Sequence, residues 1–89
     1  MQVREVAVVN RLGLHARACA KVVRVAARFR ANVVLIVSGR RASARSIIAV
    51  MMLAAAVGST VTIRADGPDE TAAAEAIVSL FAEGFGESA

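Results

Sequence analysis

Hydrophobic and polar positions change their spacing several times along the chain, and each change predicts a new element. The first segment has the mixed apolar pattern of a strand, carried by Val3, Val6, Val8 and Val9. Gly13 breaks this pattern, and helix-forming residues dominate from Ala16 onward, so we expect a helix that Asn32 closes. Its core face is predicted to consist of Cys19, Val22, Val23, Ala26 and Phe29.

The middle of the chain predicts a hairpin followed by a short helix. Residues 33–37 form a β-branched run typical of a buried strand. Ser38 and Gly39 predict a turn into a partner strand at residues 40–44. Ser46 is a candidate N-cap for an apolar helix over residues 47–56, which Gly58 terminates.

The last third predicts one more strand and one more helix. Residues 60–65 alternate between apolar and polar side chains, as a half-buried strand does. After a turn, Asp69 and Glu70 place acids at the start of a helix that ends at Gly84. Its predicted core face consists of Ala73, Ala76, Ile77, Leu80 and Phe81. The order βαββαβα predicts an α+β fold, a sheet covered on one face by helices.

Composition narrows the class of protein. The 89 residues fit a single domain, 1–89, and 57% hydrophobic residues exclude a disordered chain. No Trp or Tyr is present, which argues against a platform for stacking nucleic-acid bases. One Cys allows no intramolecular disulfide and fits a reducing compartment. No run of about 18 uncharged apolar residues occurs, so we expect a cytoplasmic protein with no direct membrane insertion.

Charge is distributed unevenly. Residues 1–45 carry ten basic side chains and one acid, whereas residues 46–89 carry one basic side chain and six acids. Along the first predicted helix, one face collects Arg17, Lys21, Arg24 and Arg28. Such asymmetry predicts an acidic protein surface, a nucleic acid or an anionic ligand as partner.

The only histidine, His15, lies where the first helix begins. Backbone N–H groups without helical partners, together with the helix dipole, favour a phosphate at this position. The same field disfavours a protonated ring, which leaves one ring nitrogen free as a nucleophile. Arg17 could bind phosphoryl oxygens through its planar guanidinium. A nucleophile, an anion site and a clamp thus fall within three residues.

Plainer interpretations of the same residues stay open at this point. A lone histidine near a helix start is often only a solvated or capping side chain. His15 and Cys19 could form half of a metal site or a Cys-His hydrolase pair, but no second metal ligand or third triad residue is evident. Ser46 is interpreted as an N-cap or as a modification site. The segment 47–53 is apolar all round, so part of it is expected to be exposed for docking or to fill core gaps.

Three segments together resemble a known family. The motif Leu12-Gly13-Leu14-His15-Ala16-Arg17, the run from Ala44 to Leu53, and the segment from Gly58 to Gly67 look like HPr, the histidine-containing phosphocarrier family of the bacterial phosphoenolpyruvate-dependent sugar phosphotransferase system. The resemblance implies an open-faced β-sandwich, a four-stranded antiparallel sheet with three helices on one face. It covers essentially the whole chain.

The resemblance also implies a role and a set of partners. Enzyme I would phosphorylate Nδ1 of His15, Arg17 would assist, and a IIA domain of a sugar permease would accept the phosphoryl group. Such a protein is a carrier rather than a complete enzyme, needs no cofactor or metal, and is expected to act as a monomer. Partners would contact Ala16, Ala20, Arg24, Ile47, Ile48 and Met51. Ser46 would be a regulatory site for an HPr kinase/phosphorylase.

The chain departs from the family pattern at two positions, and two rival functions remain. Ala18 stands where the family commonly has Pro, and Ala56 where a Gly is frequent, which could shift the end of the second helix. A nitrogen-regulatory paralogue would share the His15 chemistry but answer to a different enzyme I. A basic nucleic-acid-binding module would explain the charge, although the missing aromatics and the cations beside one histidine favour a phosphocarrier without nucleic-acid partners.

Overall fold

The structure is a computed structural model that describes residues 1–87. Its strands are β1 (Gln2–Ala7), β2 (Asn32–Val37), β3 (Arg40–Ser43) and β4 (Thr60–Asp66). Its helices are α1 (Ala16–Ala26), α2 (Ile47–Met52) and α3 (Glu70–Ala82), followed by one 3₁₀ turn, η1 (Gly84–Gly86). The predicted order βαββαβα is confirmed.

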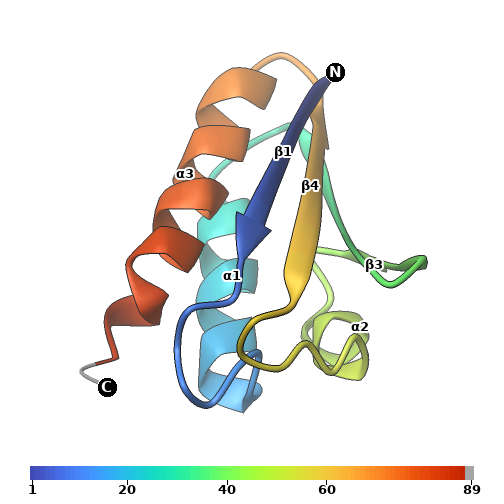
Figure 1. Ribbon diagram of the computed structural model, residues 1–89. Helices are drawn as coiled ribbons and strands as arrows, with labels where there is room; N and C mark the ends of the chain where they lie inside the picture. The colour runs from blue at the N-terminus through green and yellow to red at the C-terminus, as the bar shows by residue number, and fades with distance from the viewer. Residues whose placement is uncertain (88–89) are drawn as a thin grey trace.

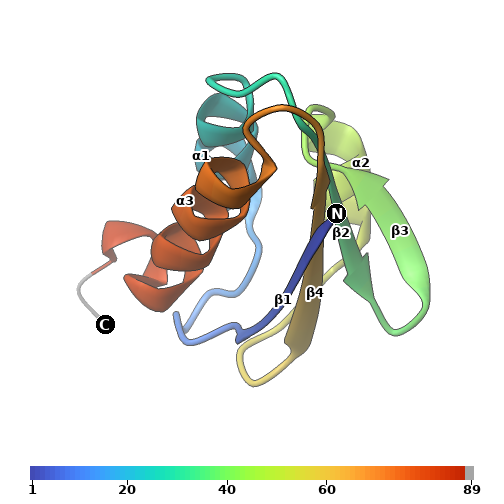
Figure 2. The same cartoon turned by 90° about the horizontal axis from the view of Figure 1, so that it is seen from above.

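The four strands form one antiparallel sheet in the order β1-β4-β2-β3. Alternation along β4 buries Val61, Ile63 and Ala65, as the period-two pattern predicts. Leu35 of β2 lies directly opposite Ile63 and is buried on the same face. Helices α1 and α3 lie side by side against this face, while α2 lies beside the β3 edge and contacts α1 (Figures 1 and 2). The predicted open-faced β-sandwich is therefore confirmed.

The core fills the space between sheet and helices with aliphatic side chains and two of the three phenylalanines. Phe81 of α3 and Phe85 of η1 pack edge to face, with ring centroids 4.9 Å apart and an interplanar angle of 65°. The predicted core face of α3 is partly corrected, because Ala74 is buried while Ala76 and Leu80 are only half-buried. Phe85 extends this core beyond the end of α3.

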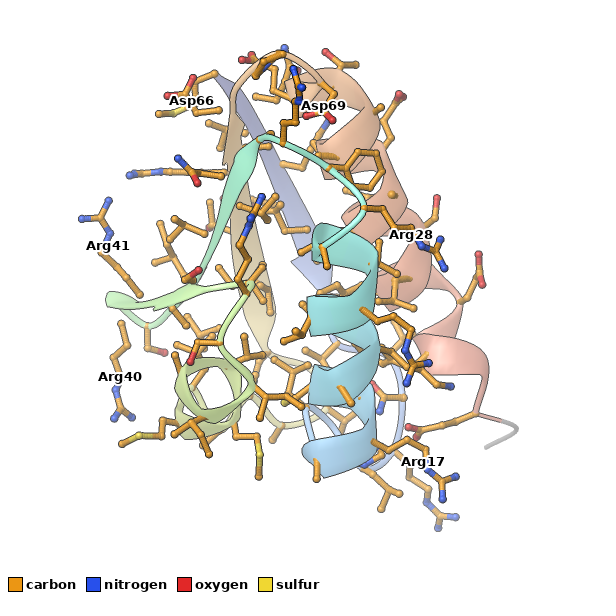
Figure 3. All side chains as sticks on the ribbon, turned by 180° about the vertical axis from the view of Figure 1, so that it is seen from behind. Arg17, Arg28, Arg40, Arg41, Asp66 and Asp69 are labelled. Carbon is orange, nitrogen blue, oxygen red and sulfur yellow. The ribbon has the colours of Figure 1, made fainter. Side chains whose placement is uncertain are left out.

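Helix α1 ends at Ala26, so the prediction that Asn32 closes it was wrong. Asn32 is instead the first residue of β2. The cause lies elsewhere in the chain, because the carboxylate of Asp69 accepts hydrogen bonds from the N–H groups of Arg30 (2.9 Å) and Ala31 (2.8 Å). These charge-assisted bonds hold the chain away from a helical path, and they lower the pKa of Asp69. Figure 3 shows Asp69 beside this connection.

The core face of α1 also differs from the prediction. Cys19, Val22 and Ala26 are buried as expected, and Ala18 joins them. Val23 is only half-buried. Phe29 lies beyond the end of the helix, where it packs against the core from the connection to β2.

Helix α2 is shorter than predicted, because it ends at Met52 rather than near Ala56. The chain leaves the helix through Ala54, whose φ of 52° lies in the left-handed region. Ala55 is buried, and its carbonyl accepts a hydrogen bond from the N–H of Leu14 at 2.9 Å. In a longer α2, this carbonyl would instead accept a hydrogen bond within the helix.

Among residues 1–87, no helix has the length and apolar character needed to cross a membrane.

Candidate functional site

The connection between β1 and α1 presents His15 at the start of the helix. Gly13 adopts φ +65°, which a side chain would disfavour. A Cβ at Gly13 would also lie 2.5 Å from the carbonyl oxygen of Ala55. Leu14 is buried next to it and anchors the connection through its bond to Ala55. His15 then becomes the N-cap residue of α1, with extended backbone (φ −79°, ψ 176°).

The first turn of α1 offers donors to an anion. The first helical hydrogen bond runs from the N–H of Cys19 to the carbonyl of His15 at 2.9 Å. The N–H groups of Ala16, Arg17 and Ala18 bond to no backbone or side-chain acceptor in the described residues. Their free protons and the helix dipole favour negative charge here. Ala18 retains an N–H that a proline would lack, and the helix still begins at Ala16.

The imidazole of His15 is held by the C-terminal segment. Its side chain is 26% exposed, and Nε2 pairs with a carboxylate oxygen of Glu87. The other oxygen of Glu87 accepts a hydrogen bond from Asn10 Nδ2 at 3.1 Å, and Nδ2 also donates to the carbonyl of Gly13 at 2.8 Å. The hydrogen bond with His15, and then that with Asn10, lowers the pKa of Glu87.

The cationic side chains predicted to share one face of the first helix differ in their contacts. Arg17 is exposed and makes no ion pair with a described residue, and Figure 3 shows it projecting outward beside the start of α1. Arg24 and Arg28 are exposed as well. Lys21 is not part of a free stripe, because it turns toward the C-terminal segment and donates to the carbonyl of Phe85. The predicted stripe of four cations is therefore corrected to three.

Cys19 does not serve a reactive site with His15. Its side chain is fully buried, and burial raises the pKa of the thiol. Its Sγ points at the carbonyl of Leu14, 3.4 Å away. A buried protonated thiol is a poor nucleophile, so the hydrolase and metal interpretations gain no support from the geometry.

Helix α2 presents an apolar surface next to α1. We call Ile47, Ile48, Met51 and Met52 the α2 patch; they are 37%, 64%, 39% and 63% exposed. Only Val50 of this helix is fully buried. The interpretation that Met51 and Met52 fill core gaps is therefore corrected, and docking stays a prediction. Ser46 caps the helix as predicted, its side chain accepting a bond from the N–H of Ala49 at 3.2 Å. Four adjacent exposed apolar residues are typical of a docking surface.

The structure places the remaining predicted contact residues on the neighbouring surface of α1. Ala16 and Arg24 are exposed, and Ala20 is half-buried between them. Helices α1 and α2 contact one another, and a shared docking surface over both stays a prediction.

Sequence reasoning missed Asn10 and Glu87. Asn10 is a buried polar residue, 3% exposed, in a connection that sequence alone marks only as a break between elements. Glu87 lies 72 residues from His15, and no local pattern joins the two. The one available signal was Gly84 and Gly86 on either side of Phe85, which indicates that the chain turns back after α3.

A partly exposed histidine at a helix start with unpartnered N–H groups, carried by a small open-faced sandwich, is an arrangement that suits a carrier of phosphoryl groups. Comparisons with known proteins agree with this class. The model of the family described as "PTS HPr component phosphorylation site" matches residues 2–83. Phosphocarrier protein HPr of Cupriavidus necator is 50% identical over 84 residues, which cover 94% of each chain.

One further relative by sequence and one solved structure are also similar to this chain. Phosphocarrier protein NPr of Proteus mirabilis is 44% identical over 87 residues, covering 97% of each chain. The crystal structure of HPr-C-His from Thermoanaerobacter tengcongensis matches with a TM-score of 0.95 and 32% identity over 100% of both chains. The chain belongs to the HPr family of phosphocarrier proteins of the phosphotransferase system.

Proposed function

We propose that this carrier accepts a phosphoryl group from enzyme I on Nδ1 of His15 and passes it to a IIA domain of a sugar permease. The single observation that carries the proposal is the position of His15. The ring stands at the start of α1, partly exposed, beside three N–H groups that no described residue uses. The incoming oxygens would meet these donors and the guanidinium of Arg17, which stabilise negative charge on the moving group.

The carrier itself needs no catalytic groups beyond His15, Arg17 and the N–H groups at the start of α1. The lone pair of Nδ1 attacks phosphorus, and the electron pair of the breaking bond stays with the donor. Positioning and charge stabilisation dominate such reactions. The active sites of donor and acceptor supply the remaining catalytic groups, so the carrier can remain small. It would act as a monomer with one domain, 1–89.

The deciding experiment is incubation of the native chain with enzyme I and phosphoenolpyruvate, followed by mass measurement at neutral and acid pH. We expect one added phosphoryl group at neutral pH that is lost in acid, because a phosphorus–nitrogen bond to histidine is acid-labile. Phosphate on serine would survive the acid step. Absence of an acid-labile adduct would contradict the proposal.

Arg17 is proposed as the phosphate clamp. The change Arg17→Ala is expected to slow transfer about tenfold, because one charge-assisted contact to the phosphoryl oxygens is lost. Folding should be preserved, since Arg17 is exposed and pairs with no described residue. Rapid-quench measurement of phosphoryl transfer from phospho-enzyme I reports the rate.

Arg28→Ala is the matched control for Arg17. Arg28 is also exposed, and it lies just beyond the far end of α1 (Figure 3). Its loss should reduce only the long-range attraction to an acidic partner, an effect that disappears at high salt. Equal losses in the two variants at high salt would remove the clamp role from Arg17.

The proposed docking surface joins two elements. Ala16, Ala20 and Arg24 of α1 would lie under one partner together with Ile47, Ile48 and Met51 of α2. A carrier that must exchange partners needs a small interface, below about 1,200 Å². The three exposed arginines of α1 and its end would steer it toward acidic surfaces, so association should weaken with salt.

Ser46 is the proposed regulatory site, a target of an HPr kinase/phosphorylase. The change Ser46→Asp is expected to raise the KM for enzyme I several-fold at low salt, because a negative charge would stand beside the α2 patch and repel an acidic partner. Stability should change little, because aspartate is as good an N-cap as serine. Steady-state transfer kinetics and a denaturation curve measure the two effects.

Ser46→Ala separates charge from capping. It removes the acceptor for the N–H of Ala49, which costs about 1 kcal/mol of stability, but it adds no charge and should leave the KM nearly unchanged. A KM that rises equally in both variants would show that the cap, and not the charge, controls docking.

A nitrogen-regulatory role is the second candidate. It is favoured by the similarity to the NPr of Proteus mirabilis across 97% of both chains. Both roles use His15 in the same way and differ in the enzyme I that charges it. Transfer rates from a sugar-type and a nitrogen-type enzyme I, measured side by side, separate them.

A further inference from the structure

Two contacts of Phe85 hold the C-terminal segment against the fold. Phe85 is buried with φ 59° and packs on Phe81. The ammonium of Lys21, from α1, donates to the carbonyl of Phe85. These contacts bring Glu87, from the opposite end of the sequence, to the imidazole of His15 at the start of α1. Figure 1 shows the C-terminal segment following α3.

Both oxygens of the Glu87 carboxylate are engaged. One faces Nε2 of His15, and the other accepts from the side-chain amide of Asn10. The same amide nitrogen donates to the carbonyl of Gly13, two residues before the histidine. A single buried amide therefore ties the carboxylate to the backbone that carries the ring.

This geometry fixes the proton on the neutral ring. The hydrogen bonds to Glu87 lower its pKa, so the group is a carboxylate at neutral pH. A carboxylate only accepts hydrogen bonds. Nε2 must therefore carry the ring proton, which leaves the lone pair on Nδ1. A carboxylate that accepts from one ring nitrogen in this way orients the other in many histidine sites.

Resting on the function proposed above, we propose that Glu87 is a positioning residue for phosphoryl transfer: it holds the Nε2–H tautomer of His15 and balances the charge of the phosphorylated ring. As the bond from phosphorus to Nδ1 forms, the donor keeps the electron pair of its broken bond. Nε2 keeps its proton throughout. The ring gains positive charge, which faces the carboxylate of Glu87, and the reverse change accompanies transfer to the acceptor.

The first test needs no partner protein. Nitrogen-15 NMR of the ring-labelled native chain, at a pH where the imidazole is neutral, is expected to show the Nε2–H tautomer alone. In Glu87→Ala we expect a mixture with Nδ1–H. Glu87→Gln replaces one of the two accepting oxygens by an NH2 group, which must face either Asn10 Nδ2 or Nε2 of His15. We therefore expect a mixture of tautomers in this variant too. A mixed population in the native chain, or a native pattern in Glu87→Ala, would overturn the proposal.

The second test measures transfer from phospho-enzyme I. Glu87→Ala is expected to lower kcat about tenfold with KM unchanged, as the loss of a partner that orients a functional histidine does. Glu87→Gln should fall between, because its one amide oxygen can still accept from Nε2 in part of the population while the charge is lost. Glu83→Ala is the matched control, an exposed acid four residues earlier with no hydrogen bond to a described side chain.

The two tests separate the possible failures. Native kcat in Glu87→Ala, or a loss confined to KM, would overturn the positioning role while the carrier function stands. A native chain that accepts no phosphoryl group would overturn the carrier function and the transfer role of Glu87 with it. Melting curves that match between Glu87→Ala and Glu83→Ala show that any difference is not loss of fold.

Discussion

Replacing His15 by alanine is expected to abolish phosphoryl acceptance from enzyme I. The variant keeps the helix start and Arg17 but has no nitrogen that could form the bond to phosphorus, and no other histidine exists in the chain. The ring is 26% exposed and belongs to no core cluster, so the fold should survive. Mass measurement after incubation with enzyme I and phosphoenolpyruvate should show the unmodified chain.

His15→Gln is the matched control for the loss of a hydrogen bond. The glutamine amide can still donate to Glu87, yet it lacks a nucleophilic nitrogen. We expect it to be as inactive as His15→Ala. An acid-labile phosphate on either variant would place the acceptor elsewhere and contradict the assignment of His15.

Gly13→Ala is expected to destabilise the protein by about 2–5 kcal/mol and to slow transfer. Positive φ costs a residue with a Cβ roughly 1–2 kcal/mol, and forcing atoms into a filled space adds about 1–3 kcal/mol. Here the new Cβ would lie 2.5 Å from the carbonyl oxygen of Ala55, so the backbone before His15 must move. Chemical denaturation and transfer kinetics measure the two consequences.

Gly39→Ala isolates the close contact from the backbone strain. Gly39 also has positive φ, +78°, but a Cβ added there would meet no atom of residues 1–87 within 4 Å. We expect a loss of about 1–2 kcal/mol, the strain alone, with native transfer. If both variants lose equal stability, or if Gly13→Ala transfers at the native rate, the packing of the His15 connection against Ala55 does not position the ring.

The local sequence pattern was sufficient to predict those elements whose buried side follows a regular spacing along the chain. The alternation in residues 60–65 specifies the buried face of β4, and the cap at Ser46 acts only three residues along. The position of His15 at the start of α1 followed from Gly13 and the helix formers after it. These signals depend on backbone geometry that a few neighbouring residues determine.

The predictions failed where a contact with a residue far away in the sequence determines the local structure. The end of α1 depends on Asp69, 39 residues from Arg30, and the end of α2 on a bond between Leu14 and Ala55. Glu87 reaches His15 across 72 residues. Helix-forming residues continue past both true helix ends, so propensity alone favoured longer helices. No periodicity encodes a tertiary hydrogen bond, so the sequence could single out His15 as a candidate but not the carboxylate that pairs with it.

The bond from Leu14 to Ala55 has a consequence for recognition. It joins the chain just before the imidazole to the chain just after α2, at 2.9 Å. This bond holds the α2 patch and the ring of His15 at a set distance from one another. Under the proposed function, a partner seated on the patch would bring its reacting atom to the same place each time, so that different donors and acceptors could use one site on the carrier.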